Sequence, residues 1–153
     1  MGWVTLTLRK RELKVEHARY QLRDLQISRE KRQLAREKSL NQSIFKADQQ
    51  AELSAIRTQY QSTRNNLTAN GVTAEVSTEL SNAQFDYQSQ VDAIKTFYEG
   101  ECEILEQEAA DREAELDEEQ VTVEAQMEAI SQEMQAVSDA ISNEIQNSTI
   151  KLS

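Results

Sequence analysis

The stretch LTANGVT, residues 67–73, decides how this chain folds. Asn70-Gly71 lies at its centre, and both residue types tolerate the left-handed backbone conformation with which helices commonly end. Thr73 follows with a side-chain oxygen that can cap the first turn of a new helix. The stretch therefore predicts that one helix ends near residue 67, that the backbone reverses at Asn70-Gly71, and that a second helix begins at Thr73.

The rest of the chain offers few places to leave a helix. Its 153 residues include no proline and only three glycines, at positions 2, 71 and 100. Long helices are the default for such a sequence, because proline and glycine are the residues that interrupt helices at the greatest cost. We expect an all-α fold, a long antiparallel coiled-coil-like hairpin in a single elongated domain over residues 1–153, with helices at 9–67 and 73–147. Gly100 lies inside the second helix, where a kink or a close contact is expected.

The two expected helices carry opposite charge. Residues 9–38 contain eleven Lys/Arg against five Asp/Glu, whereas residues 99–144 contain sixteen acids and a single base, Arg112. A reversal at Asn70-Gly71 places residue i opposite a residue near 141 − i, so that the basic stretch faces roughly residues 103–132. Each exposed ion pair contributes only about 0–1 kcal/mol, but a row of pairs selects one antiparallel register. We expect these charges to pair within one chain or between neighbouring chains.

Apolar residues recur at coiled-coil spacing near both ends of the chain. Near the amino end one row recurs every seven residues: Leu6, Leu13, Tyr20, Ile27 and Leu34. A second, parallel row consists of Leu8, Val15 and Leu22. Near the carboxyl end, steps of four and three residues give the seam that we expect to pack on the first 20 or so residues: Val123, Met127, Ile130, Met134, Val137 and Ile141. The positions midway along the first row are polar, which predicts a narrow or hydrated seam: Lys10, His17, Asp24 and Lys31.

The middle of the hairpin has a sparser apolar pattern. Most of the apolar residues at 44–67 keep to one helix face: Ile44, Phe45, Leu53, Ile56, Tyr60 and Leu67. The facing stretch steps by four or three residues: Tyr87, Val91, Ile94, Tyr98, Cys102, Leu105 and Ala109. Cys102 is the only cysteine, so it forms no internal disulfide, and its place in this row indicates a small apolar seam residue.

The first eight residues allow two interpretations. Residues 3–8 are rich in β-formers and alternate, which is typical of a strand, but the seven-residue rows begin inside the same segment and favour a helix from Thr5. On either interpretation we expect residues 1–8 to form a docking segment that binds a partner through Trp3, Val4, Leu6 and Leu8. Trp3 could instead cover the end of the seam. The tail at 148–153 is expected to fray or to dock on a neighbour.

The residue types needed for catalysis or metal binding do not occur together. The only histidine is His17 and the only cysteine is Cys102, which is too few for a zinc site. The acids at 101–119 lack the Asp- and Gly-containing loop of calcium sites, and no glycine-rich phosphate loop is present. A thin pair of helices also offers no concave pocket for a nucleophile and its base. We therefore expect no catalytic residues, metal, cofactor or small-molecule substrate.

Targeting signals are also lacking in the sequence. Residues 1–8 have no basic region followed by a long apolar run, so a signal peptide is not predicted. No stretch approaches the roughly 18 apolar residues of a membrane span. We expect the chain inside a cell or within a virion.

One resemblance is architectural. The length, the two expected helices and the stretch YQSTRNNL, residues 60–67, resemble the small coiled-coil hairpins of secretion and flagellar export systems, the stalk-like proteins that sit in a ring ATPase. The resemblance implies an adaptor or chaperone hairpin for such an ATPase, and it assigns no site residues.

The sequence favours a non-catalytic structural subunit, packed as a homo-oligomer or beside other proteins in a large assembly such as a virus or phage particle. The adaptor hairpin is one alternative. A nucleic-acid-binding protein is another, since bases along the first helix could neutralise phosphates, although interleaved acids and a net charge of −10 weigh against it. A chain that folds only on binding is a third.

Overall fold

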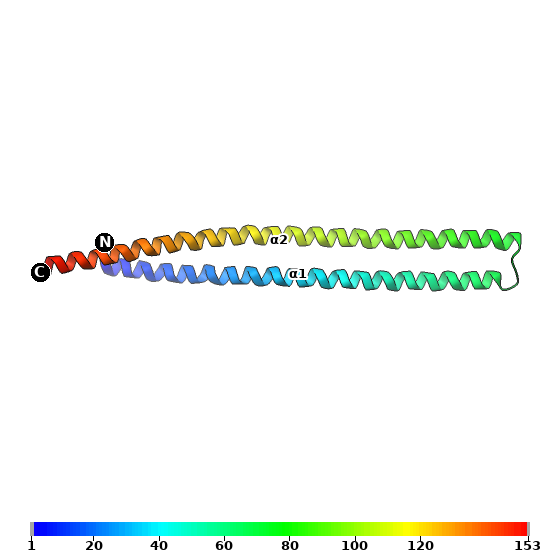
Figure 1. Ribbon diagram of the computed structural model, residues 1–153, viewed down its shortest axis with the longest axis horizontal. Helices are drawn as coiled ribbons and strands as arrows, with labels where there is room; N and C mark the ends of the chain where they lie inside the picture. The colour runs from blue at the N-terminus through cyan, green and yellow to red at the C-terminus, as the bar shows by residue number, and fades with distance from the viewer. Residues whose placement is uncertain (1, 153) are drawn as a thin grey trace. The chain divides into compact units, whose positions relative to one another are not determined.

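The protein is an all-α helical hairpin, as the sequence predicts. A computed structural model describes the backbone of residues 2–152 and the side chains of residues 2–149. Helix α1 spans Trp3–Thr68 and helix α2 spans Ala74–Leu152, with no strand among the described residues. The two helices run in opposite directions and are joined by a short loop (Figure 1).

Helix α1 begins at Trp3, so the strand interpretation of residues 3–8 is wrong. The amides of Thr5 and Leu6 donate to the carbonyl of Gly2 at 3.1 and 3.2 Å, which starts the helical hydrogen-bond pattern. The seven-residue apolar period overrides the local preference of β-forming residues, because it lets Leu6 pack on α2 while Val4 and Leu8 stay exposed. The first helix thus starts six residues before the predicted Arg9.

The loop forms where the sequence places it. The amide of Gly71 donates to the carbonyl of Thr68 at 3.1 Å, and Gly71 has a φ of 94°, in the left-handed region that favours glycine. Asn70 does not share this conformation, since no described non-glycine residue has a positive φ. Thr73 caps α2 as predicted: its hydroxyl oxygen accepts from the amide of Val76 at 3.3 Å.

Helix α2 continues past the predicted end at residue 147 to Leu152. Of the predicted tail, residues 148–152 are therefore helical, and Ser153 lies outside the described residues. Helix α2 is unbroken at Gly100, and a Cβ built there would meet no atom within 4 Å. The predicted close contact at Gly100 is therefore wrong, while a change of helix direction there stays a prediction.

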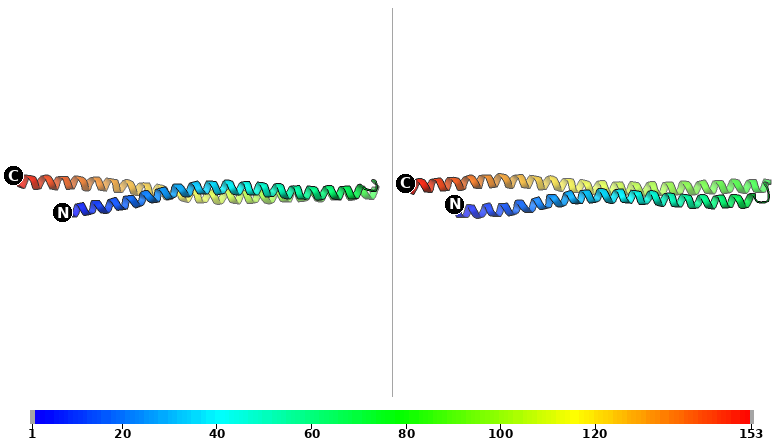
Figure 2. Two further views of the ribbon diagram at one scale, coloured as in Figure 1. Left: turned by 90° about the horizontal axis from the view of Figure 1, so that it is seen from below. Right: turned by 60° about the horizontal axis from the view of Figure 1, so that its bottom comes forward.

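The chain divides into two compact units. Unit 1 consists of Met1–Leu34 with Asp111–Ser153, and unit 2 consists of Ala35–Ala110. In unit 1 the amino-terminal part of α1 lies along the carboxyl-terminal part of α2, whose end extends beyond the start of α1 (Figure 2). In unit 2 the two helix segments lie side by side and end at the loop (Figure 1).

Unit 1 has a seam with a seven-residue period. One cluster is centred on Leu13, Ile130 and Val137, and a second on Ile27, Leu116 and Val123. Leu13 and Ile27 are fully buried and Leu116 is 1% exposed. Around these centres pack half-buried residues from both helices: Leu6, Tyr20, Leu34, Met127, Met134 and Ile141. The first predicted row and the predicted α2 row are therefore the two sides of this seam.

Unit 2 has a seam with a different period, of eleven residues. On α1 the inward residues Phe45, Ile56 and Leu67 are eleven apart and all half-buried. On α2 the same spacing connects four inward residues: Val76, Tyr87, Tyr98 and Ala109. Tyr98 and Ala109 are each 7% exposed. Ile44, one of the apolar residues predicted in this stretch, is 45% exposed.

Candidate interaction surfaces

The six seam residues expected on α2 lie on the face that meets α1. Val123, Ile130 and Val137 are buried at 5%, 6% and 9% exposure. Met127, Met134 and Ile141 are half-buried and pack against the two clusters. These six side chains are therefore engaged within the hairpin, and little of their apolar surface is left for another protein.

The four residues expected to dock on a partner separate into two groups. Leu6 is half-buried and packs against the cluster of Leu13, Ile130 and Val137 in the seam. Trp3, Val4 and Leu8 are 53%, 56% and 54% exposed. Trp3 is not among the residues packed against either buried cluster, and whether it covers the end of the seam stays a prediction. Exposed apolar side chains of this size are available to a partner, which leaves docking by these three residues a prediction.

Ion pairs cross the seam of unit 1 as the charge pattern predicts. Arg9 donates through Nε and Nη2 to Glu133 Oε1 at 3.1 and 2.8 Å. Arg23 makes a two-pronged contact with Glu119, with Nε to Oε1 at 2.5 Å and Nη2 to Oε2 at 2.6 Å. A bidentate pair such as Arg23–Glu119 fixes orientation as well as attracting charge. The ion pairs therefore hold the register of α1 against α2.

The Arg23–Glu119 contact belongs to a longer network. Arg23 Nη1 also donates to Glu30 Oε1 at 3.2 Å, and Arg112 Nη2 donates to Glu30 Oε2 at 3.2 Å. Arg112 Nη1 in turn reaches Glu115 at 3.0 Å. The only base among residues 99–144 is thus used to bind an acid of α1. The network alternates in sign from end to end, so each charge has an opposite neighbour.

A polar cluster occupies two of the polar positions midway along the first apolar row. Gln120 donates from Nε2 to Asp24 Oδ1 at 3.2 Å and accepts at Oε1 from Lys31 Nζ at 2.6 Å. Lys31 also forms an ion pair with Asp117. Asp24 and Lys31 are two of the polar positions midway along the first apolar row, and both are half-buried. The seam therefore combines apolar clusters with polar residues that hydrogen-bond across it, while its predicted hydration stays a prediction.

Two pKa shifts follow from the Arg23–Glu119 contact. The hydrogen bonds from Arg23 lower the pKa of Glu119, against a smaller upward effect of burial. The same hydrogen bonds raise the pKa of Arg23 above its ordinary value. Hydrogen bonds from Arg9 to Glu133 and then Glu12 likewise raise the pKa of Arg9. The Arg23–Glu119 contact thus favours the charged form of both of its partners.

The ion pairs fit the predicted antiparallel register with a small offset. The relation 141 − i gives 132 for Arg9 and 118 for Arg23, and the observed partners are Glu133 and Glu119. Lys31 deviates more, reaching Asp117 where the relation gives 110. Helical side chains lean towards the amino end of their own helix, and on antiparallel helices this lean brings together residues whose numbers sum higher than those of facing backbone positions.

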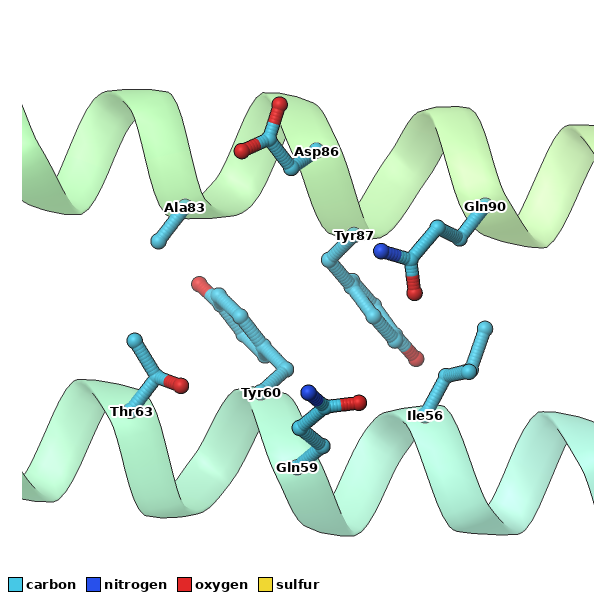
Figure 3. A pocket seen from close by; sticks show the side chains of 8 residues that line it. All are labelled: Ile56, Gln59, Tyr60, Thr63, Ala83, Asp86, Tyr87 and Gln90. Carbon is cyan, nitrogen blue, oxygen red and sulfur yellow. The ribbon is translucent and has the colours of Figure 1, made fainter.

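A tyrosine pair lies in the seam of unit 2, near the loop. The rings of Tyr60 and Tyr87 are stacked, with centroids 4.6 Å apart and planes 12° apart. Each ring points towards the opposite helix (Figure 3). They line an open hollow of about 180 Å³, with the remaining lining supplied by Ile56, Gln59, Thr63, Ala83, Asp86 and Gln90. The pair joins α1 to α2 through ring contact where large aliphatic residues are few.

A second aromatic contact in unit 2 includes a charged partner. The hydroxyl of Tyr98 donates to Glu52 Oε1 at 2.9 Å. Burial, followed by this hydrogen bond to a carboxylate, raises the pKa of Tyr98. Phe97 and Phe45 flank the ring at centroid distances of 5.2 and 6.5 Å. The contact therefore combines apolar burial of the ring with a bond between the two helices.

One surface was only partly visible in the sequence. The second row, Leu8, Val15 and Leu22, faces away from the seam, at 54%, 49% and 55% exposure. Other exposed positions of α1 join this row at alternating steps of four and three. The full set, here called the outer stripe, is Val4, Leu8, Arg11, Val15, Ala18, Leu22, Leu25 and Arg29. The signal that could have identified it is a second heptad repeat in α1, offset from the first.

His17 and Cys102 have ordinary surroundings. Cys102 is half-buried in the α2 row to which the sequence assigned it. His17 is half-buried and lines an open hollow of about 570 Å³ that also includes Asp24 and Met127. Across the described residues no three His, Cys, Asp or Glu side chains are grouped as a metal site would need. Neither residue belongs to a cluster with evident chemistry.

Comparisons with known proteins do not assign a function to this chain, so a function has to be inferred from its residues. Of the helices that the structure describes, none has a stretch apolar and long enough to cross a lipid bilayer. No protein-family model, curated protein or solved structure matches this chain.

Proposed function

We propose that this chain is a non-catalytic structural subunit, packed in many copies or beside other proteins in a large assembly such as a virus or phage particle. The outer stripe is the observation that supports this role best. Five of its eight residues are large and apolar, and these are 49–56% exposed: Val4, Leu8, Val15, Leu22 and Leu25. A helix that carries apolar heptads on two faces has one face for its own hairpin and one for a further helix.

The ion pairs favour this role over nucleic-acid binding. Arg9, Arg23 and Lys31 bind acids of α2. Phosphate would have to displace those acids, and the net charge of −10 repels a polyanion. These three bases therefore act in holding the hairpin together, and the other bases of the first helix are proposed to meet acids of neighbouring proteins.

The test measures mass and helicity of the purified full-length chain together. A helical oligomer, seen by far-UV circular dichroism and light scattering, supports the structural subunit. A helical monomer that captures a ring ATPase supports the adaptor instead. A mostly unfolded chain supports folding on a partner, and a salt-dependent shift of DNA or RNA in a gel supports nucleic-acid binding.

Salt tests the contribution of charge to assembly. Charges on exposed side chains are screened over about 10 Å at 0.1 M salt and about 3 Å at 1 M. We expect the oligomer to dissociate, or its mass to fall, as salt is raised from 0.1 to 1 M. An unchanged mass in light scattering would show that charge complementarity does not hold the assembly.

A further inference from the structure

The outer stripe lies on the face of α1 that points away from α2. Leu13 and Ile27 mark the inner face and are fully buried, whereas all eight residues of the outer stripe are exposed. Along a helix of 3.6 residues per turn, steps of four and three keep the eight residues on one side. From Val4 to Arg29 the stripe extends for roughly 38 Å at ~1.5 Å per residue. It has the length and pattern of half a coiled coil.

Single exposed apolar residues are common on protein surfaces, but a continuous row of them usually marks a binding surface. Six of the eight positions are apolar, and only Arg11 and Arg29 are charged. In heptad terms Leu8, Val15 and Leu22 are a positions, and Val4, Ala18 and Leu25 are d positions. Among the side chains that the structure describes, the other large exposed apolar residues on the α2 part of unit 1 are Val121 and Ile145, which are 24 residues apart in the sequence.

We propose that the outer stripe is a homodimer surface, on which a second copy of this chain packs its own α1 in the antiparallel direction. The proposal deepens the proposed structural role, on which it rests, by naming the surface through which two copies join. In antiparallel coiled coils an a residue lies beside a d residue of the partner helix. Leu8 then lies beside Leu25 of the second copy, and Val15 beside Ala18 of the second copy.

The charges beside the stripe select this alignment. Glu12 and Arg19 occupy the same flank, at the heptad e position, and in this alignment Glu12 of each copy faces Arg19 of the other. Glu12 is 66% exposed despite its contact with Arg9 at 3.2 Å, and Arg19 makes no ion pair with any described residue. On the other flank Lys14 faces Gln21 of the second copy. Two new ion pairs of opposite sign therefore form, with no like charges opposed.

Other alignments bring like charges together. A shift by one heptad in one direction opposes Glu12 to Glu12, and in the other direction it opposes Arg19 to Arg19. A parallel pair places Arg11 beside Arg11 within the apolar row and Lys14 beside Arg19. Like charges directly opposed disfavour an alignment. The stripe is thus complementary to itself in one antiparallel register, which is why a second copy fits better than an unrelated acidic helix.

The surface already has the hollow that this packing requires. An open hollow of about 430 Å³ is lined by Leu8, Arg11, Glu12, Val15, Glu16 and Arg19. Four of these, at spacing i, i+3, i+4 and i+7, form the four-residue hole that receives one side chain in a coiled coil. In the proposed register the side chain opposite Arg11 is Leu22 of the second copy. The stems of Arg11 and Arg29 can pack along the apolar row while their guanidinium groups reach water.

The first experiment measures the mass of the full-length chain by analytical ultracentrifugation. Wild type is expected to sediment at about twice 17.5 kDa, or as a multiple of that dimer. Val15→Glu with Leu22→Glu should weaken dimerisation at least tenfold with unchanged helicity, since both residues lie outside the seam. Val121→Glu is the control, because Val121 is 66% exposed on α2, and it should leave the dimer intact.

The second experiment exchanges the flanking charges. Glu12→Arg alone opposes two bases, and Arg19→Glu alone opposes two acids, so each variant should be shifted towards monomer. An equimolar mixture of the two should restore the dimer, as should the double variant, because each contact again joins opposite signs. A merely structural effect of either substitution would not be repaired by mixing.

The outcomes separate this surface from the proposed role. An oligomeric wild type whose mass is insensitive to all of these substitutions overturns the surface and leaves the structural role in place. A wild type that is a helical monomer overturns both. Association of the single-charge variants as strong as that of wild type, or a mixture that stays monomeric, overturns the proposed register.

Discussion

At the residue scale, Gly71 and Gly100 differ in backbone conformation. Gly71 has a φ of 94°, which side-chain-bearing residues rarely adopt, whereas Gly100 lies inside an unbroken helix. A Cβ at either position would meet no atom within 4 Å. Both sites therefore have room for a side chain, and only the backbone conformation distinguishes them.

Alanine at these positions should change stability in opposite directions. Gly71→Ala forces a left-handed conformation on an L-residue and is expected to lower the free energy of unfolding by about 1–2 kcal/mol. Gly100→Ala removes the entropic cost of glycine in a helix and is expected to raise it by up to about 1 kcal/mol. Urea denaturation followed by circular dichroism measures both. A stabilising Gly71→Ala would show that the loop does not need its observed conformation.

Residue chemistry explains why the loop could be predicted. Asn-Gly followed by Thr is a local signal, and both Gly71 and Thr73 act as their residue types suggest. Residues 3–8 failed as a local signal because β-propensity is weak when a helical seam competes. In the helix, Leu6 packs against the seam cluster that contains Ile130 and Val137 of α2, which favours the helix over a strand.

At the element scale, burial is uneven along helix α1. Leu13 is fully buried between Ile130 and Val137, whereas Leu40 on the same helix is 61% exposed. Leu13→Ala should lower the free energy of unfolding by about 2–5 kcal/mol, because the transfer term and the cavity term both apply. Leu40→Ala, the matched control in unit 2, should change it by no more than about 0.5 kcal/mol. If both variants lowered the free energy of unfolding by similar amounts, Leu13 would not be a core residue of the seam.

The two units differ in the period of their seams. Unit 1 repeats every seven residues, as in Leu13, Tyr20 and Ile27, and unit 2 repeats every eleven, as in Phe45, Ile56 and Leu67. A seven-residue period winds two helices to the left, while an eleven-residue period winds them gently to the right. Steps of four and three residues were visible in the sequence, but the longer period shows only when the inward residues are known on both helices.

The eleven-residue period also identifies polar residues in the seam of unit 2. Gln49 is eleven residues from both Lys38 and Tyr60, and it is half-buried, whereas its neighbour Gln50 is exposed. Gln49→Leu should raise the free energy of unfolding by roughly 1 kcal/mol through added apolar burial. Gln50→Leu serves as the control and should have little effect on the urea midpoint. If Gln50→Leu raised the free energy of unfolding more than Gln49→Leu, the face of α1 that carries Gln49 would not be the seam.

At the scale of the whole molecule, opposite charge on the two ends of the sequence predicted which residues meet. The basic residues Arg9 and Arg23 find acids within one residue of the positions expected from the loop alone. The outer stripe could not be derived in the same way. A row of apolar residues on one helix does not say which of two rows the chain itself will cover, and that was settled by the pairing of Leu13 and Ile27 with α2.

The excess of acid over base also makes the whole chain sensitive to pH. The chain has 27 Asp and Glu residues against 17 Lys and Arg, so acidification relieves repulsion along α2 while it removes the ion pairs with α1. These two effects oppose each other, and the pH dependence of total stability mixes them. A single substitution separates the ion-pair part.

Glu119 is the residue for that test, because hydrogen bonds from Arg23 lower its pKa in the folded chain. In the unfolded chain its pKa returns to about 4.3. A carboxyl group whose pKa is lower when folded stabilises the fold above the unfolded pKa and loses that effect as the pH falls through the folded pKa. Glu119→Gln should therefore lower the urea midpoint at pH 7, and the difference from wild type should shrink towards zero well below pH ~4.

Glu118→Gln provides the matched control for this experiment. Glu118 is the exposed neighbour of Glu119 and makes no ion pair with any described residue, yet its substitution removes the same formal charge. Removing one of many repelling acids at that position should not lower the midpoint at pH 7. If Glu119→Gln lowers the midpoint equally at pH 7 and pH 3, the loss comes from packing. The Arg23 contact would then hold the register of the helices without adding pH-dependent stability.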